Sequence, residues 1–275
     1  MVSAVVGLET RLVESLVTST KIVLIVEYDG TRYYGFQLQA NLPTVQRELE
    51  VALEKLTGEK RRVMAASRTD TGVHARGQVI SFRTGSSLPL SAFVNGINYY
   101  LPEDIAVKAA SRVSDSCDVR RGAVSREYNY YILNKLPRSP LRRGYSYRVG
   151  GHLDIEAMDQ ACQALIGEKD YSSFVTGEED ETKSTVRRIS RAEVVRDDDL
   201  VVFQVVANSF LRHQVRNTVG TLIRVGLGKM TVDEFYSLVE AKRPSLAGPT
   251  APACGLCLIR VNYPGPLGED TWGDI

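Results

Sequence analysis

Cysteine and histidine are scarce in this chain of 275 residues. The four cysteines, Cys117, Cys162, Cys254 and Cys257, do not form the dense disulfide framework of a small secreted protein. Cys254 and Cys257 make one C-x-x-C motif, but a closed zinc site needs four ligands and the sequence has no second pair. The three histidines show no metal-ligand spacing. We therefore expect reduced thiols and no bound metal.

Long apolar runs are also missing. No window offers the roughly 18 uncharged apolar residues that a membrane-spanning helix needs. Residues 1–20 contain Glu9, Arg11 and Glu14, which interrupt the apolar run of a secretory signal. The sequence thus favours a cytoplasmic protein with no membrane partner. Residues 1–20 are interpreted as an N-terminal extension, either a tail or a short amphipathic helix.

An excess of charge of one sign is absent as well, because the formal net charge is only +1. Of the 34 basic residues, however, 25 are arginine, whose planar donor fork suits phosphate and can stack on bases. This composition fits a basic face for a nucleic acid, or arginines scattered over the surface. The acidic runs are Glu178–Glu181 and Asp197–Asp199. The arginine clusters are Arg61-Arg62, Arg120-Arg121, Arg142-Arg143, Arg187-Arg188 with Arg191, and Arg212 with Arg216.

Strand and helix patterns alternate along the first part of the chain. Apolar and β-branched runs predict the strands, and apolar stripes at helical spacing predict the helices. Asp29-Gly30 ends the first strand, and Gly58 ends the first helix. The predicted strands are Lys21–Tyr28, Arg62–Ala66, Gln78–Phe82 and Ile105–Ala110, and the predicted helices are Pro43–Leu56 and Leu90–Tyr100.

A similar order then begins again. Asp154 is a predicted helix cap, and Asp197–Asp199 forms the turn of a hairpin. Residues 134–152 are rich in Arg, Pro and Gly and are expected to form an exposed connection. The predicted strands are Glu127–Leu133, Arg188–Val195, Leu200–Val206 and Gly255–Val261, and the predicted helices are Ile155–Ile166, Phe210–Leu227 and Val232–Ala241.

These patterns predict an α+β fold of two similar α+β halves, with mainly antiparallel sheets joined around a central cleft. The N-terminal half spans residues 21–113, the C-terminal half spans residues 114–264, and residues 265–275 form a tail. A cleft between two joined halves is a natural place for a large ligand.

The most informative stretch is the loop of residues 66–75, A-S-R-T-D-T-G-V-H-A, between two predicted strands. It brings together a guanidinium, a carboxylate, hydroxyls, a glycine and an imidazole. Loops held by rigid strands are where catalytic groups concentrate. An Arg-Thr-Asp sequence alone is equally typical of a turn with an Asx hydrogen bond, so the loop by itself leaves both interpretations open.

With its neighbouring motifs, this loop resembles the tRNA pseudouridine synthase A family, whose signature is G-R-T-D-x-G-V-H-A. The other family motifs follow in family order between about residues 21 and 264, and several motifs in order are far more specific than one. The matching segments are Tyr28-Asp29-Gly30, Tyr34-Gly35-Phe36-Gln37, Arg126-Glu127-Tyr128-Asn129-Tyr130, Asp170–Phe174, Phe210–Asn217 with Gly220, and Gly255-Leu256-Cys257-Leu258.

Two departures from the family pattern stand out. Ser67 replaces the usual glycine before the arginine, and it restricts the backbone where glycine is permissive. The usual F-H-A-R sequence before the tyrosine strand reads Cys117-Asp118-Val119-Arg120 here. The departures concern substrate contacts and leave open a pseudouridine synthase with another RNA target.

The resemblance implies the pseudouridine synthase fold and three catalytic residues. Asp70 matches the family's catalytic aspartate, which acts as a nucleophile or as a base. Arg216 matches the arginine that keeps this carboxylate ionised; a helix-surface ion pair is the alternative interpretation. Tyr128 matches the active-site tyrosine, whose ring stacks on uracil; a half-buried strand aromatic is the alternative.

The resemblance also implies the substrate and its contacts. The family isomerises uridine to pseudouridine in the anticodon stem-loop of tRNA, at tRNA positions 38–40, as a homodimer and without a cofactor or metal. The predicted substrate-binding residues are Arg68, Tyr128, His74, Arg120 and Arg212. For His74, a hydrogen bond that fixes the loop is favoured over acid–base chemistry. A non-catalytic RNA-binding or chaperone protein on the same fold and a metal-dependent hydrolase using Asp70 and His74 are the competing hypotheses.

Overall fold

The computed structural model describes residues 19–175 and 184–267. Residues 1–18 of the predicted N-terminal extension, the acidic run Glu178–Glu181 and most of the predicted C-terminal tail lie outside the described residues. In the ranges that are described, no helix is long and apolar enough to cross a membrane.

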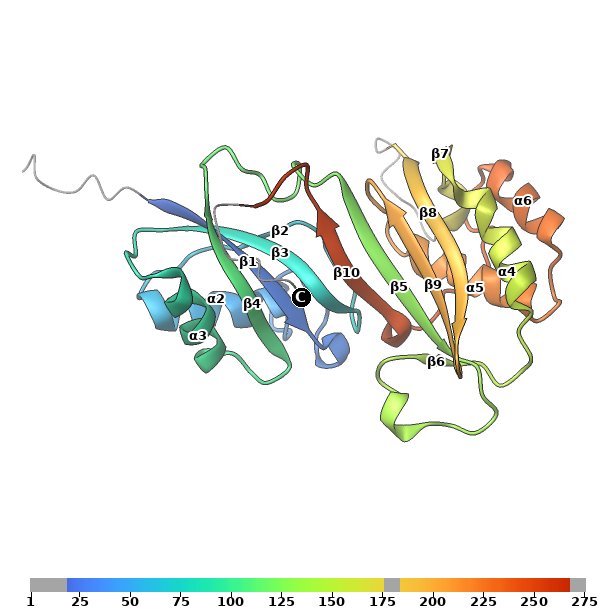
Figure 1. Ribbon diagram of the computed structural model, residues 1–275, viewed down its shortest axis with the longest axis horizontal. Helices are drawn as coiled ribbons and strands as arrows, with labels where there is room; N and C mark the ends of the chain where they lie inside the picture. Colours follow the sequence, from blue (N-terminus) through green and yellow to red (C-terminus); the bar gives the residue numbers. More distant parts are fainter. Residues whose placement is uncertain (1–18, 176–183, 268–275) are drawn as a thin grey trace, which may run out of the picture.

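The strands form one continuous sheet through the described residues. Their bounds are β1 (Thr20–Tyr28), β2 (Met64–Ala65), β3 (His74–Thr84), β4 (Ile105–Val113), β5 (Ser125–Leu133), β6 (Tyr147–Arg148), β7 (Gly167–Asp170), β8 (Val186–Asp197), β9 (Leu200–Ala207) and β10 (Leu256–Asn262). The sheet order is β4-β1-β3-β10-β5-β9-β8-β7, with β2 beside β3 and β6 beside β5 (Figure 1). All of these pairs are antiparallel except β10 with β3 and β6 with β5, which confirms the mainly antiparallel α+β class.

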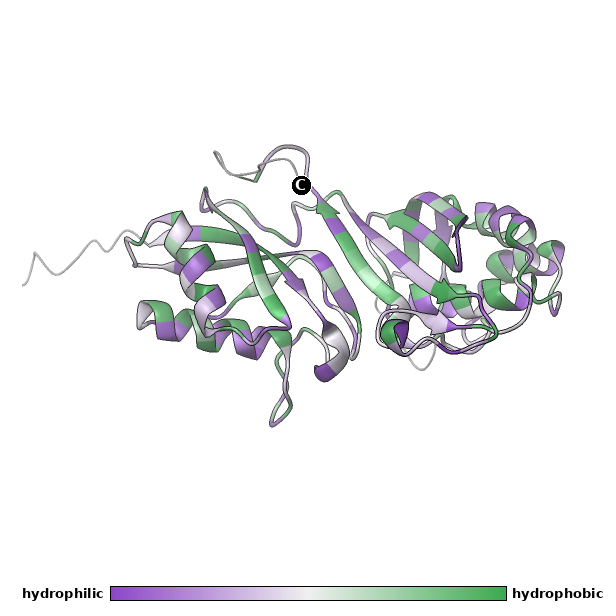
Figure 2. Ribbon diagram, turned by 60° about the horizontal axis from the view of Figure 1, so that its bottom comes forward, coloured by the Kyte–Doolittle hydropathy of each residue, from purple (hydrophilic) through white to green (hydrophobic). Residues whose placement is uncertain are grey.

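The helices gather at the two ends of the sheet in Figure 1. The α-helices are α2 (Val45–Thr57), α3 (Leu90–Tyr100), α4 (Ile155–Cys162), α5 (Gln214–Gly226) and α6 (Val232–Ala241). The 3-10 helices are η1 (Gly30–Arg32), η2 (Pro140–Arg142), η3 (Gln163–Leu165), η4 (Ser172–Phe174) and η5 (Ala253–Gly255). Figure 2 shows hydrophobic and hydrophilic residues alternating along the ribbons of these helices, the pattern of helices that cover a core on one side.

Local sequence explains the bounds of the elements that begin the chain. The run Ile22–Val26 in β1 is buried along its whole length, and the strand lies between β3 and β4 in the sheet. Helix α2 begins after Thr44, whose side-chain oxygen accepts a hydrogen bond from Arg47 N, and ends at Gly58, which adopts the left-handed conformation at φ 75°.

The two halves meet at β10. This strand pairs in parallel with β3 through Cys257 and Leu258, and it pairs antiparallel with β5, where Leu258 lies opposite Tyr128. The loop that precedes β3 and the middle of β5 are therefore brought side by side. Both helical ends and both halves share a single cluster of buried side chains, and each fully buried large apolar side chain stabilises the fold by about 1.5–3 kcal/mol.

Several predicted bounds are wrong at their edges. Strand β2 covers only Met64–Ala65 of the predicted Arg62–Ala66, whereas β3 begins at His74, four residues before its predicted start. The helix predicted over Ile155–Ile166 becomes the 3-10 helix η3 after Cys162. The connection of residues 134–152 is not wholly irregular, because it contains η2 and β6. Apolar periodicity does not report these ends, since pairing partners far along the chain decide them.

Helix α5 begins at Gln214, so the prediction that it starts at Phe210 is wrong. His213 has φ 59° and ψ 0°, a left-handed conformation that cannot belong to a right-handed helix. The four residues before Gln214 therefore form a loop. This loop faces the loop of residues 66–75, which contains Asp70, across a cleft.

Candidate active site

A cleft of about 610 Å³ opens between the two halves. Its walls are the loop of residues 66–75, the middle of β5, and the loop that leads into α5. Its lining residues are Tyr34, Gln37, Gln39, Ala65–Thr71, Val73, Arg120, Arg126, Tyr128, Ser209–Arg216 and Leu256. The predicted central cleft is thus present, and it is lined from both halves.

Asp70 and Arg216 meet in this cleft although they are 146 positions apart in the chain. Arg216 Nη1 lies 3.4 Å from Asp70 Oδ2, and the two side chains are 16% and 31% exposed. At this degree of burial the ion pair is less screened by water than a surface pair, so the positive charge of Arg216 acts strongly on the carboxylate. The structure therefore brings together two of the predicted catalytic residues.

The guanidinium of Arg216 is held from a second side. Its Nε donates a hydrogen bond of 2.8 Å to Ala251 O, in the segment that leads to β10. Ala251 N in turn donates to Arg216 O at 3.1 Å. Because the arginine is fixed at both its backbone and its Nε, only its terminal nitrogens are directed at Asp70. A lysine has no equivalent of this forked geometry.

His213 is a member of the site that sequence reasoning missed. Its Nε2 lies 3.6 Å from Asp70 Oδ2, the same oxygen that faces Arg216. The left-handed backbone of His213 turns the chain just before α5, and strained non-glycine conformations of this kind cluster at functional sites. In the sequence, its position three residues before Arg216 was the signal that could have indicated a place in the site. It was missed because the segment was interpreted as continuous helix.

Two glycines let the Asp70 loop pack closely against the segment that follows β1. A Cβ atom added at Gly30 would lie 2.0 Å from Val73 O, and one at Gly35 would lie 2.7 Å from Thr69 O. Gly35 also has φ +87°, a backbone conformation that residues with a side chain rarely adopt. Phe36 N donates to Thr69 O at 3.1 Å, so this segment binds the backbone of the loop directly.

A network of hydrogen bonds between buried polar groups holds the loop of residues 66–75 in place. Gln78 on β3 is completely buried; its Oε1 accepts from Ser67 N at 3.3 Å, and its Nε2 donates to Ser67 O at 2.8 Å. The same Nε2 lies 3.3 Å from the hydroxyl of Tyr28, which bonds the hydroxyl of Thr69 at 2.7 Å. Burial raises the pKa of Tyr28, so this network stays neutral at physiological pH.

Tyr128 projects from β5 and is 6% exposed. Its ring meets the edge of Phe210 at a centroid distance of 5.2 Å and an interplanar angle of 87°, a favourable aromatic geometry. Its hydroxyl lies 3.0 Å from Ser67 Oγ. Burial, together with the charge of Asp70, raises the pKa of Tyr128 to about 12, so the phenol is protonated at neutral pH.

His74, one of the predicted substrate-binding residues, is not among the residues that line the cleft. The side chain is buried, Nδ1 accepts a hydrogen bond from Gly30 N at 3.1 Å, and Nε2 donates to Gly144 O at 2.9 Å. Tyr145 covers the ring at a centroid distance of 5.2 Å. His74 therefore fixes the loop, and it has no ring nitrogen left for a substrate or a metal ion.

Arg126, the arginine of the tyrosine strand, acts as a structural clamp. Its buried guanidinium donates to Ala123 O and Asn208 O through Nη1, and to Ala66 O and Arg120 O through Nη2, at 2.7–3.2 Å. Burial lowers its pKa from the ordinary arginine value. One side chain thus joins the backbones of the segments that form three walls of the cleft.

We expect Arg126→Lys to lower the free energy of unfolding by about 2–4 kcal/mol, because one ammonium cannot replace four fixed hydrogen bonds. Chemical denaturation measures this change. The matched control is Arg83→Lys, because Arg83 forms an exposed pair with Asp115 at 2.6 Å, a contact worth under about 1 kcal/mol. Equal small losses in both variants would contradict the clamp.

All three predicted substrate-binding arginines lie at the cleft. Arg68, Arg120 and Arg212 all line it, and all three are exposed. They come from the Asp70 loop, the segment before β5 and the loop before α5. Guanidinium groups are the side chains that most often pair with phosphate, and here three exposed ones edge a single cleft.

The chemistry available in the cleft is that of a carboxylate with a guanidinium and an imidazole beside it, next to a neutral phenol. Among residues 19–175 and 184–267, no three His, Cys, Asp or Glu side chains are grouped to hold a metal ion. Cys254 and Cys257 are free thiols, and burial raises the pKa of Cys257 to about 12. Asp70 is therefore suited to nucleophilic attack or proton removal.

Known proteins resemble this chain over most of its length. The family model described as tRNA pseudouridine synthase matches residues 24–120 and 161–264. A tRNA pseudouridine synthase A of Francisella tularensis is 40% identical over 242 residues, which cover 88% of this chain and 93% of the relative. Relatives with the same name from a Thermoanaerobacter species and from Pelobacter propionicus are 41% and 43% identical, over 88% of this chain and 99% of each relative.

Proposed function

We propose, for a chain that belongs to the tRNA pseudouridine synthase A family, that Asp70 and Arg216 form the catalytic pair. The protein is an isomerase that converts uridine to pseudouridine in tRNA. The observation that supports the pair is the 3.4 Å contact between Arg216 Nη1 and Asp70 Oδ2, inside a cleft edged by exposed arginines.

The reaction rearranges one nucleoside without loss or gain of atoms. The bond from uracil N1 to ribose C1′ breaks, the base turns, C5 bonds to C1′, and the proton on C5 is removed while N1 regains one. The steps are redox-neutral overall, so side chains can supply what they require. Asp70 serves as nucleophile toward the ribose or the uracil, or as the base that removes a proton.

The ion pairs of Asp70 in the described residues all use Oδ2. Arg216 Nη1 and His213 Nε2 lie 3.4 and 3.6 Å from this oxygen, and we propose that Oδ1 is the oxygen that meets the substrate. A carboxylate fixed in this way loses little orientational freedom when the nucleoside binds, which lowers the barrier to attack or proton transfer. Arg216 also places a positive charge 3.4 Å from this carboxylate within the cleft.

Tyr128 is proposed to hold the target uracil. Its ring lies on β5 at the wall of the cleft, and it shares this wall with Phe210, so a planar base can stack there. The phenol is protonated at neutral pH, since its pKa is raised to about 12. It therefore serves as a hydrogen-bonding group for the base, while Asp70 is the anionic group.

The target uridine must leave its helix to enter the cleft. Flipping a nucleotide costs a few kcal/mol, which stacking on Tyr128 and phosphate contacts to Arg68, Arg120 and Arg212 offset. We propose that the substrate region is the anticodon stem-loop, with adjacent uridines on its 3′ side as targets. We also propose a cytoplasmic homodimer in which one tRNA contacts both subunits.

The direct test maps pseudouridine in total RNA, tRNA included, from cells with and without this protein. We expect pseudouridine to disappear from the anticodon stem-loop in its absence and to return when the wild-type chain is supplied. Loss at sites in another RNA would identify a different target. An unchanged pseudouridine map would reject the catalytic function and favour the RNA-binding alternative.

The exposed arginines give a prediction about salt. We expect tRNA binding to weaken steeply as salt rises, and Arg212→Ala to make the slope of log K against log salt shallower by about 1, because each phosphate contact releases about one counterion. Filter binding at several salt concentrations measures the slope. Arg83→Ala, outside the cleft, is the control and should leave the slope unchanged.

A further inference from the structure

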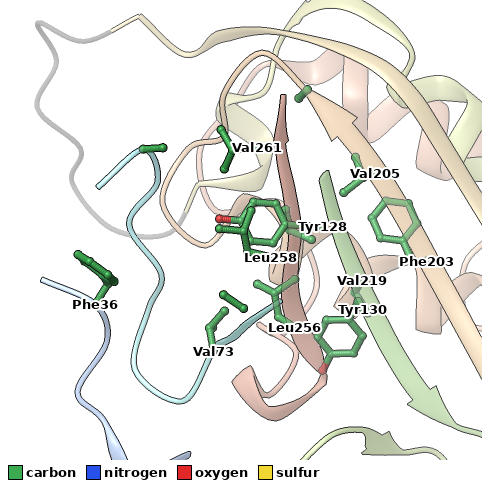
Figure 3. Close-up of a cluster of buried hydrophobic side chains, with 14 of the residues drawn as sticks. Phe36, Val73, Tyr128, Tyr130, Phe203, Val205, Val219, Leu256, Leu258 and Val261 are labelled. Carbon is green, nitrogen blue, oxygen red and sulfur yellow. The ribbon is translucent and has the colours of Figure 1, made fainter. Parts of the chain in front are cut away.

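Ser67 and Tyr128 form a hydrogen-bonded pair across the cleft wall. Ser67 Oγ lies 3.0 Å from the Tyr128 hydroxyl, and the tyrosine ring is 6% exposed. Figure 3 shows the ring of Tyr128 packed near Leu258, with its oxygen on the side that faces the loop carrying Val73. This is the loop on which Ser67 and Asp70 lie, so the phenol oxygen points toward the catalytic carboxylate's own loop.

The position of Ser67 is fixed by the core. Gln78 bonds both its N–H and its carbonyl, at 3.3 and 2.8 Å, and Gln78 is completely buried on β3. Two backbone bonds to a buried side chain leave the Ser67 backbone little freedom. The serine hydroxyl therefore has a defined place from which to meet Tyr128.

A phenol hydroxyl rotates to suit its partners, and its proton prefers one of two positions in the plane of the ring. When Ser67 occupies one of these positions, the other is left for a group that enters the cleft. Without Ser67 Oγ, the buried hydroxyl would lose its partner on the loop and would turn between both positions. A glycine, the usual residue of the matching family motif, has no hydroxyl to offer.

We infer that Ser67 is a positioning residue, whose hydroxyl holds that of Tyr128 in the orientation that meets the target base. The inference rests on the proposed function, in which Tyr128 faces the uracil. It assigns a role to the position at which this chain departs from the signature of its family. Ser67 itself does not touch the reacting atoms.

Kinetics give the first test. We expect Ser67→Ala to lower the single-turnover rate of pseudouridine formation about three- to tenfold, the loss of one hydrogen bond, with the tRNA dissociation constant unchanged. The rate of Ser67→Gly should fall by the same factor. Ser67→Thr keeps a hydroxyl and should retain most of the wild-type rate. In a Tyr128→Phe background, Ser67→Ala should cause no further loss. Equal losses in both backgrounds, or a fully active Ser67→Gly enzyme, would overturn the inference.

A second test needs no substrate and does not depend on the proposed function. Tyrosine is labelled with carbon-13 at Cζ, and the Tyr128 signal is assigned by its disappearance in Tyr128→Phe. We expect Ser67→Ala to shift this signal at neutral pH, because the shift of Cζ responds to hydrogen bonding of the hydroxyl. Ser111→Ala, a buried serine on β4, is the control and should leave it in place. An unmoved signal in Ser67→Ala would refute the pair even in an active enzyme.

Discussion

Asp70→Ala is expected to lower pseudouridine formation by at least about 10²–10⁴-fold, the contribution typical of a positioned acid–base or nucleophilic group. Asp70 supplies a carboxylate to the lining of the cleft, and its Oδ2 lies 3.4 Å from Arg216 and 3.6 Å from His213. Binding of tRNA should persist, because it depends on arginine contacts to phosphate and because the substitution removes a negative charge. Single-turnover rates and filter binding measure the two effects separately.

The control for Asp70→Ala is the same substitution at an aspartate outside the cleft. Asp115→Ala removes an exposed carboxylate that pairs with Arg83 at 2.6 Å, and it should leave the rate unchanged. Persistent turnover in Asp70→Ala would remove this residue from the mechanism. Loss of tRNA binding together with activity would instead indicate that the variant had not folded or that Asp70 contacts the RNA.

Arg216→Gln should reduce both the rate and the stability. We expect the rate to fall about 10²–10³-fold, because the charge that fixes the carboxylate is lost. We expect the free energy of unfolding to fall by about 2–3 kcal/mol, because the hydrogen bond to Ala251 O also disappears and Asp70 loses its partner. Arg216→Lys should recover only a small part of either, since one ammonium cannot reach both partners.

Arg224→Gln is the matched control, because Arg224 lies in the last turn of the same helix, α5. A cation at a helix C-terminus contributes about 0.3–1 kcal/mol to the free energy of unfolding. This variant should therefore be only slightly less stable than the wild type, and its rate of pseudouridine formation should be unchanged. If Arg216→Gln resembled Arg224→Gln, Arg216 would be a surface residue of the helix. The pairing with Asp70 would then have no catalytic role.

Much of the architecture was predictable from sequence because local patterns and distant pairing agree. The apolar run of β1 and the amphipathic stripe of α2, with its cap at Thr44 and its end at Gly58, specify their elements without help. The ordered motifs also predicted that Asp70, Tyr128, Arg216 and the arginines Arg68, Arg120 and Arg212 belong to one site. The structure places all of these residues on the lining of one cleft.

The remaining features depend on contacts that no local pattern encodes. The pairing of His213 with Asp70 requires a left-handed residue before α5, and apolar periodicity passes through that residue as if it were helical. The role of His74 follows from Gly30 and Gly144, which lie 44 and 70 positions away. The link between Ser67 and Tyr128 spans 61 positions, so the sequence shows the substitution but not its partner.

The place of β10 in the sheet has a consequence for biosynthesis. Among the described residues this strand is the last in sequence, yet it lies between β3 and β5 and joins the two halves. During translation, both halves therefore expose an unpaired edge until residues 256–262 leave the ribosome. We therefore expect Asp70 and Arg216 to reach their 3.4 Å contact only after β10 has paired with both strands, and a nascent chain that lacks β10 to be inactive.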